Sequence, residues 1–128
     1  MYGPVSIPFD ARMLFNIVRL KPGVDMDDVE LALAEMCNVV KEAYGNDKGG
    51  FLAGQVFRFS GFISEEGSVI SGSEEPHLAI VTYWKTYEQH EASHADAIFR
   101  EKFSALAAMC DSTQELGYDM LWQGVPET

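Results

Sequence analysis

The sequence predicts an α+β domain in which two helices cover one face of a four-stranded antiparallel sheet. The expected elements follow the order β-α-β-β-α-β, and the first helix carries a single apolar stripe. The chain has 128 residues, 47% of them hydrophobic, which suits one domain with its own core. We expect an N-terminal arm over residues 1–11, the domain over residues 12–124 and a tail over residues 125–128.

The first half of the chain supplies a strand and a helix. The strand is expected over residues 13–20, with Leu14, Asn16 and Val18 on one face. A Lys-Pro-Gly turn separates it from a helix over residues 25–44, whose acidic first turn suits the helix macrodipole. The apolar stripe of this helix consists of Val29, Leu33, Met36, Cys37, Val40 and Tyr44.

The second half supplies three strands and a second helix. Strands are expected over residues 51–62 and 77–84, on either side of a loop rich in glycine, serine and glutamate. Thr86 and Gln89 form a capping box that begins a helix running, continuous or interrupted, to about residue 109. A last short strand is expected over residues 118–123.

Charge and hydropathy exclude several classes of partner. The formal net charge is −11, so nucleic acid and anionic membranes would be repelled. No apolar run is long enough to span a bilayer, and the first eight residues lack the basic region of a signal peptide. We therefore expect a cytoplasmic protein with a small-molecule substrate.

Large aromatic residues on the strands predict a partner for the sheet. We expect Phe57, Phe59, Trp84 and Trp122 on the face that the helices leave open. An apolar face of that size indicates an interaction surface. The simplest partner is a second copy, which gives a homodimer paired sheet against sheet.

Two of the three histidines lie four residues apart in the string His90-Glu91-x-x-His94. On a helix this spacing places both imidazoles on one face, where they can bind one metal ion. The same string matches the zincin protease pattern, but that pattern needs a further ligand downstream and no histidine follows His94. Both histidines could also be ordinary polar residues on a partly solvated helix.

The chain resembles the dimeric α/β barrel superfamily, which includes the antibiotic-biosynthesis-type monooxygenases. The resemblance rests on the order of elements and on Trp84-Lys85, followed by His90 and an amphipathic helix with Phe99. It covers about residues 12–124 and implies two ferredoxin-like subunits paired through their sheets. It implies fold far more than chemistry.

Residues 83–94 are locally similar to the sulfur oxygenase reductases. That similarity implies a mononuclear non-haem iron held by His90, His94 and a carboxylate at the start of the last strand. The nearest carboxylate is Asp119, which matches only with a one-residue gap and a change from glutamate to aspartate. Two imidazoles and one carboxylate leave open positions on the metal for dioxygen and substrate.

The same similarity implies a sulfur-carrying cysteine on the first helix, where this chain has Cys37. The departures are that those enzymes have much longer chains and more cysteines. The alternative for Cys37 and Cys110 is that both are buried thiols that act as small hydrophobic residues.

Three hypotheses for function remain. The first is a small metal-dependent oxidoreductase with iron, zinc or manganese at His90, His94 and Asp119. Glu91 would then orient a ligand and Cys37 would contact the substrate, and both are candidate catalytic residues.

The second hypothesis is a cofactor-free monooxygenase acting on a small aromatic. Here His90 or His94 is the base, and Tyr83, Trp84 and Trp122 are candidate substrate-binding residues. The third is a non-catalytic dimeric ligand-binding protein.

Overall fold

Four strands form one antiparallel sheet among the residues that the computed structural model describes, which are 3–63, 66–67 and 75–127. The order across the sheet is β2-β3-β1-β4. The elements are β1 (Arg12–Leu20), α1 (Met26–Tyr44), the short 3-10 helix η1 (Asn46–Lys48), β2 (Phe51–Arg58), β3 (Leu78–Trp84), α2 (Tyr87–Ser93), α3 (Ala97–Ala107) and β4 (Cys110–Asp119).

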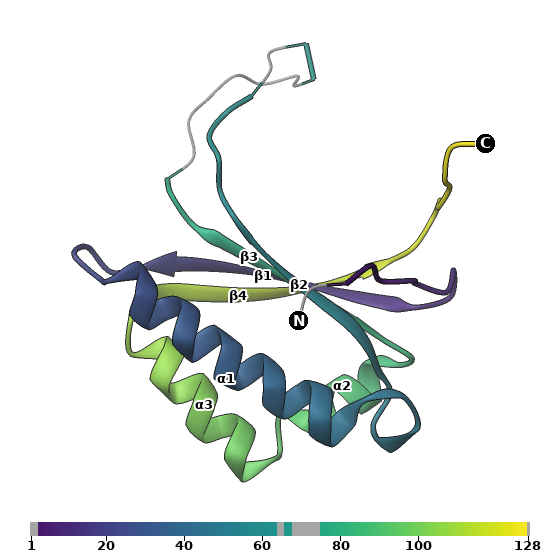
Figure 1. Ribbon diagram of the computed structural model, residues 1–128, viewed down its shortest axis with the longest axis horizontal. Coiled ribbons are helices and arrows are strands. Elements are labelled where there is room, and N and C mark those ends of the chain that lie inside the picture. The colour runs from purple at the N-terminus through teal and green to yellow at the C-terminus, as the bar shows by residue number, and fades with distance from the viewer. Residues whose placement is uncertain (1–2, 64–65, 68–74, 128) are drawn as a thin grey trace.

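The helices all lie on one face of the sheet, and the other face is open (Figure 1). The predicted α+β, ferredoxin-like arrangement is therefore confirmed. In the described part of the chain, no helix combines the length and the apolar character needed to cross a bilayer.

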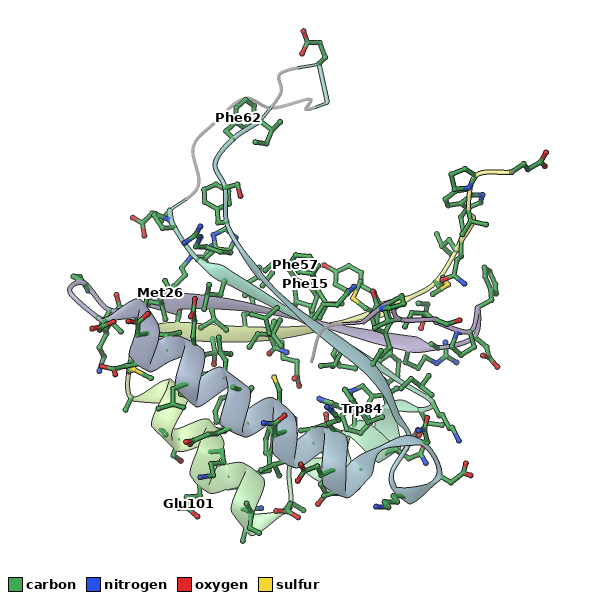
Figure 2. All side chains as sticks on the ribbon, viewed as in Figure 1. Phe15, Met26, Phe57, Phe62, Trp84 and Glu101 are labelled. Carbon is green, nitrogen blue, oxygen red and sulfur yellow. The ribbon has the colours of Figure 1, made fainter. Side chains whose placement is uncertain are left out.

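Strand β1 occupies the middle of the sheet and sets which residues face the helices. It pairs with β3 on one side and with β4 on the other. Leu14 and Val18 are 5% and 1% exposed and belong to the core beneath the helices. Phe15 alternates with them and lies on the open face (Figure 2).

Helix α1 begins and packs as its sequence predicts. The side chain of Asp25 accepts a hydrogen bond from the Asp27 backbone N–H at 2.8 Å, which satisfies one of the free donors of the first turn. Of the predicted stripe, four residues are buried, together with Ala32: Val29, Leu33, Met36 and Val40.

The predicted second long helix is two helices. α2 ends at Ser93 and α3 begins at Ala97, because the Asp96 side chain caps α3. The Asp96 carboxylate accepts hydrogen bonds from the backbone N–H groups of Ile98 and Phe99 at 2.8 and 3.1 Å. An aspartate with this role favours a helix start over a helix interior.

The prediction of the last strand was wrong. We expected it over residues 118–123, whereas β4 spans Cys110–Asp119. β4 is an edge strand that pairs only with β1, and most of its residues are exposed. Its polar sequence, CDSTQELGYD, therefore lacks the apolar alternation by which a half-buried strand is recognised.

The open face carries fewer of the expected rings than the sequence suggested. Phe57 lies on it and is 51% exposed (Figure 2). Trp84 was wrongly placed there, because it lies on the helix side with 1% exposure. Trp122 follows β4 and is 80% exposed.

Candidate functional site

Helix α2 brings both histidines of the predicted motif to the end of β3. The predicted cap is confirmed, since Thr86 Oγ1 accepts a hydrogen bond from the Gln89 N–H at 3.1 Å. The helix therefore begins at Tyr87, three residues after Trp84. The His90 ring meets the Trp84 ring edge-on, with centroids 5.3 Å apart.

A partly buried hydrogen bond joins this helix to the edge strand. His90 is 3% exposed, and its Nε2 lies 3.1 Å from Glu115 Oε2 on β4. The tautomer with its proton on Nε2 donates to this carboxylate. Asn16 Nδ2 on β1 donates to the same oxygen at 3.2 Å, so Glu115 is held by two elements of the fold.

His94 lies beside this pair but reaches solvent. Its side chain is 35% exposed, and its Nε2 lies 3.9 Å from Glu115 Oε2. The ring stacks on Phe99 of α3, with centroids 5.0 Å apart and planes 6° from parallel. The two imidazole centroids are 4.2 Å apart. The site thus has a buried histidine, an accessible histidine and a shared carboxylate.

The electrostatics keep His94 in its neutral form at neutral pH. Burial lowers the pKa of His94 below its usual value, and the adjacent His90 lowers it further. The nearby glutamates oppose this shift without reversing it. A neutral, solvent-accessible imidazole is a proton acceptor.

Glu115 is ionised over a wider pH range than an ordinary glutamate. Burial alone would raise the pKa of its carboxyl, but the hydrogen bonds from His90 and Asn16 and the charges of the imidazoles outweigh it and lower the pKa. Its side chain is 30% exposed. The carboxylate can therefore stabilise a positive charge that develops on His94.

One nitrogen in the cluster lacks a hydrogen bond. Within the described residues, His90 Nδ1 is buried and has no hydrogen-bond partner. Glu91 Oε1 lies 3.3 Å from it, on a side chain that is 71% exposed. Glu91 was predicted to orient a metal ligand, and its carboxylate lies near the His90 nitrogen that does not contact Glu115.

The three potential metal ligands in this cluster differ from the predicted set. Donor atoms of His90, His94 and Glu115 lie within 4.8 Å of one another, a donor set of the type that binds divalent ions. Asp119 is not among them. Its Oδ1 accepts hydrogen bonds from Arg12 at 2.9 Å and from Tyr87 at 3.1 Å.

Strand geometry explains why Asp119 is too far away. Glu115 and Asp119 face the same side of β4, but four residues of strand separate them by about 13 Å. Glu115 pairs with Asn16 in the middle of β1, whereas Asp119 pairs with Arg12 at its start. Sequence reasoning missed Glu115 because it placed this residue outside the last strand. Only the pairing register of β4 against β1, which places Glu115 opposite Asn16, identifies this glutamate as part of the site.

The predicted substrate-binding residues do not meet. Trp84 is buried on the helix side, and its Nε1 donates to Thr82 Oγ1 at 3.0 Å. Tyr83 pairs with Met13 and, by alternation, faces the opposite side of the sheet. Trp122 lies beyond the end of β4 with 80% of its surface exposed. The three residues therefore do not line one pocket.

Cys37 packs against the core from α1. Burial raises the pKa of its thiol. A reactive thiol needs the opposite shift, since the thiolate is the nucleophile. Burial also raises the pKa of the Cys110 thiol at the start of β4.

A cavity of about 300 Å³ lies at the other end of β3 from the histidines. It is bounded by α1 and β2, and its lining includes Leu33, Val56, Arg58 and Leu78. Leu78 begins β3 and Trp84 ends it, so roughly 20 Å of strand lies between the cavity and the cluster.

Comparison with solved structures gives the same fold. The chain is similar to SnoaB from Streptomyces nogalater, a cofactor-independent oxygenase, with a TM-score of 0.67 and 14% identity over 92% of this chain and 99% of that one. It is similar to a candidate antibiotic biosynthesis monooxygenase from Caulobacter crescentus, with a TM-score of 0.63 and 13% identity over 89% and 93% of the two chains.

A third similar structure is a dimeric ferredoxin-like protein of unknown function from Thermobifida fusca. Its TM-score is 0.64, with 11% identity over 94% of this chain and 100% of that one. No family model matches the sequence, and no curated protein matches it. At these identities the similarity establishes the fold.

These comparisons contradict the first hypothesis, a metal-dependent oxidoreductase. The similar structures include a cofactor-independent oxygenase and a candidate antibiotic biosynthesis monooxygenase. They give no support to the resemblance to sulfur oxygenase reductases. The resemblance to the antibiotic-biosynthesis-type proteins is supported at the level of fold.

Proposed function

We propose that the protein is a cofactor-independent oxygenase of the antibiotic-biosynthesis-monooxygenase type that acts on a small electron-rich aromatic. The observation that carries this proposal is the position of His94, a solvent-accessible imidazole of lowered pKa whose Nε2 lies 3.9 Å from the Glu115 carboxylate. The fold that the chain shares with SnoaB supports the same chemistry.

In this proposal His94 is the general base. It removes the proton of a phenolic hydroxyl, and the resulting phenolate gives up an electron to dioxygen far more readily than the phenol does. For a naphthol, one oxygen atom enters the ring and the other leaves as water with two substrate hydrogens, so the product is a quinone. Glu115 stabilises the imidazolium that His94 becomes.

His90 and Asn16 act on the base through Glu115. Their hydrogen bonds at 3.1 and 3.2 Å fix the carboxylate beside His94. His90 is 3% exposed, so we assign it a positioning role rather than contact with substrate. The Phe99 ring stacks on the His94 ring and so keeps the imidazole in its orientation.

We further propose that the protein is a homodimer joined through the open face of its sheet. The exposed Phe57 on that face supports this arrangement, as does the Thermobifida fusca protein, which is described as dimeric. A cytoplasmic location remains a prediction.

Oxygen uptake tests the proposed chemistry. Purified protein is given a panel of naphthols, hydroquinones and catechols, and oxygen consumption and quinone absorbance are recorded. His94→Gln removes the base and should lower kcat by about 10²- to 10⁴-fold. His77→Gln is the matched control, because His77 bonds the Glu75 carbonyl in the loop before β3 and should leave kcat unchanged. Equal loss in both variants, or no loss in His94→Gln, contradicts the proposal.

The separation between cavity and histidines favours one alternative, a non-catalytic ligand-binding protein. The cavity of about 300 Å³ beside α1 would then hold the ligand, with Arg58 at its edge. This alternative predicts that the phenol panel gives no turnover with wild-type protein, and that Leu33→Trp, which fills the cavity, abolishes the binding of any ligand found by calorimetry.

A further inference from the structure

Helix α2 is too short to fix its own position in the fold. It has seven residues, and a helix of fewer than about 12 residues is marginally stable without the packing around it. Tyr87, His90 and His94 follow one another at spacings of three and four, so their side chains lie along one face of α2 and its C-terminal cap. That face meets the edge strand β4, where His90 bonds Glu115.

A second contact joins α2 to β4 at the start of the helix. The Tyr87 hydroxyl donates to Asp119 Oδ1 at 3.1 Å, and Arg12 Nη1 on β1 donates to the same oxygen at 2.9 Å. The guanidinium carbon of Arg12 lies 5.7 Å from the centroid of the Tyr87 ring. We call Arg12, Tyr87, Gly117 and Asp119 the tyrosine clamp. It ties the start of α2 to two neighbouring strands.

Gly117 leaves room for the Tyr87 ring in this clamp. A Cβ atom on Gly117 would lie 3.2 Å from Tyr87 Cε1 and 3.3 Å from the hydroxyl oxygen, which is closer than side chains ordinarily pack. Glycine weakens the interior of a strand, and it is typical of places where another group comes close to the backbone. Gly117 lies between Glu115 and Asp119 on the same face of β4. The strand therefore gives α2 a flat seat between its two carboxylates.

We propose that the tyrosine clamp holds α2 against β4 and thereby fixes His90 and His94 beside Glu115. The consequence for catalysis rests on the proposed oxygenase function, whereas the effect on the site does not. Tyr87 is a positioning residue rather than a catalytic one, because seven residues of helix, roughly 10 Å, separate it from His94. The position of α2 matters because His94 Nε2 is already 3.9 Å from Glu115 Oε2, so a small outward movement separates them.

Exchange of the His90 Nε2 proton with solvent reports on the clamp without any substrate. His90 is 3% exposed and bonded to Glu115, so this proton should give a slowly exchanging resonance in the NMR spectrum. Tyr87→Phe removes the clamp's hydroxyl and should speed the exchange by about twofold to tenfold, the factor that one hydrogen bond of ordinary net strength contributes. Tyr118→Phe is the matched control, because Tyr118 packs on Phe15 on the open face and should leave the rate unchanged.

A double-mutant cycle shows whether the hydroxyl acts through Asp119. Tyr87→Phe and Asp119→Ala should speed the exchange by similar factors, and together they should do no more than either alone. Gly117→Val favours a strand more than glycine does, but it places a side chain under the Tyr87 ring and should exceed both. In the oxygen-uptake assay Tyr87→Phe should lower kcat by about twofold to tenfold with KM unchanged, since the clamp acts on the base and not on the substrate.

The outcomes separate the clamp from the proposed reaction. Faster exchange in Tyr87→Phe with no change in Tyr118→Phe supports the clamp, and it does so even where wild-type protein oxidises no phenol and the oxygenase proposal falls. Unchanged exchange in both Tyr87→Phe and Gly117→Val overturns the inference. Additive effects of Tyr87→Phe and Asp119→Ala overturn it as well, because the hydroxyl would then act elsewhere.

Discussion

Replacing Glu115 with leucine should destabilise the protein through His90. The substitution removes the acceptor 3.1 Å from His90 Nε2, and His90 is 3% exposed, so water cannot easily replace it. Leaving a buried donor unpaired costs about 1–3 kcal/mol. Because the Glu115 side chain is itself 30% exposed, we expect the lower part of that range, about 1–2 kcal/mol.

Urea unfolding at one fixed protein concentration measures this cost. Glu115→Gln keeps an oxygen that can accept from His90 and should lose about 1 kcal/mol or less. Asp119→Leu is a control on the same strand and face. It breaks an ion pair with Arg12 whose side chains are 45% and 67% exposed, a contact worth about 0–1 kcal/mol, and the exposed hydrogen bond that Tyr87 donates to the same carboxylate at 3.1 Å. If Glu115→Leu costs no more than Asp119→Leu, the hydrogen bond between His90 and Glu115 does not stabilise the fold in the way proposed.

Four further outcomes follow from the core, the helix cap and the titrating groups. Trp84→Ala should lower the free energy of unfolding by about 3–5 kcal/mol, measured by urea denaturation, since the ring is 1% exposed. Thr86→Ala should cost about 1 kcal/mol through loss of the α2 cap, and Thr86→Ser should restore most of it. The rate of oxygen uptake should rise with pH with a midpoint below 6.5, because burial lowers the pKa of His94, and Glu115→Gln should move that midpoint lower still. The same shift makes the unfolded chain bind the His94 proton more readily, so stability should fall as pH drops below 6.5, and again below 4.5 as Glu115 is protonated.

The parts of the fold that the sequence predicts are those whose burial repeats with a clear period. β1 and α1 each turn one apolar face to the core, and the capping box at Thr86 marks the start of α2 directly. β4 carries no such signal, because an edge strand with both faces partly in water needs few apolar residues.

The candidate site depends on that missed strand. His90 and His94 could be predicted from the sequence because residues four apart on a helix lie on the same face. Glu115 lies 21 residues after His94 and joins them only through the register of β4 against β1, which pairs it with Asn16. The choice of Asp119 as the third ligand rested on its position along the sequence, and the register of the strands does not support it.

Oxygen uptake by metal-depleted protein tests the central proposal most directly. Protein is treated with a strong chelator, its iron, zinc and manganese contents are measured, and turnover of the active phenol is compared before and after. We expect that kcat is unchanged after depletion, that one dioxygen is consumed per quinone formed, and that His94→Gln lowers the kcat of the depleted protein by about 10²- to 10⁴-fold. Activity that disappears on chelation and returns with a stoichiometric divalent metal would contradict it.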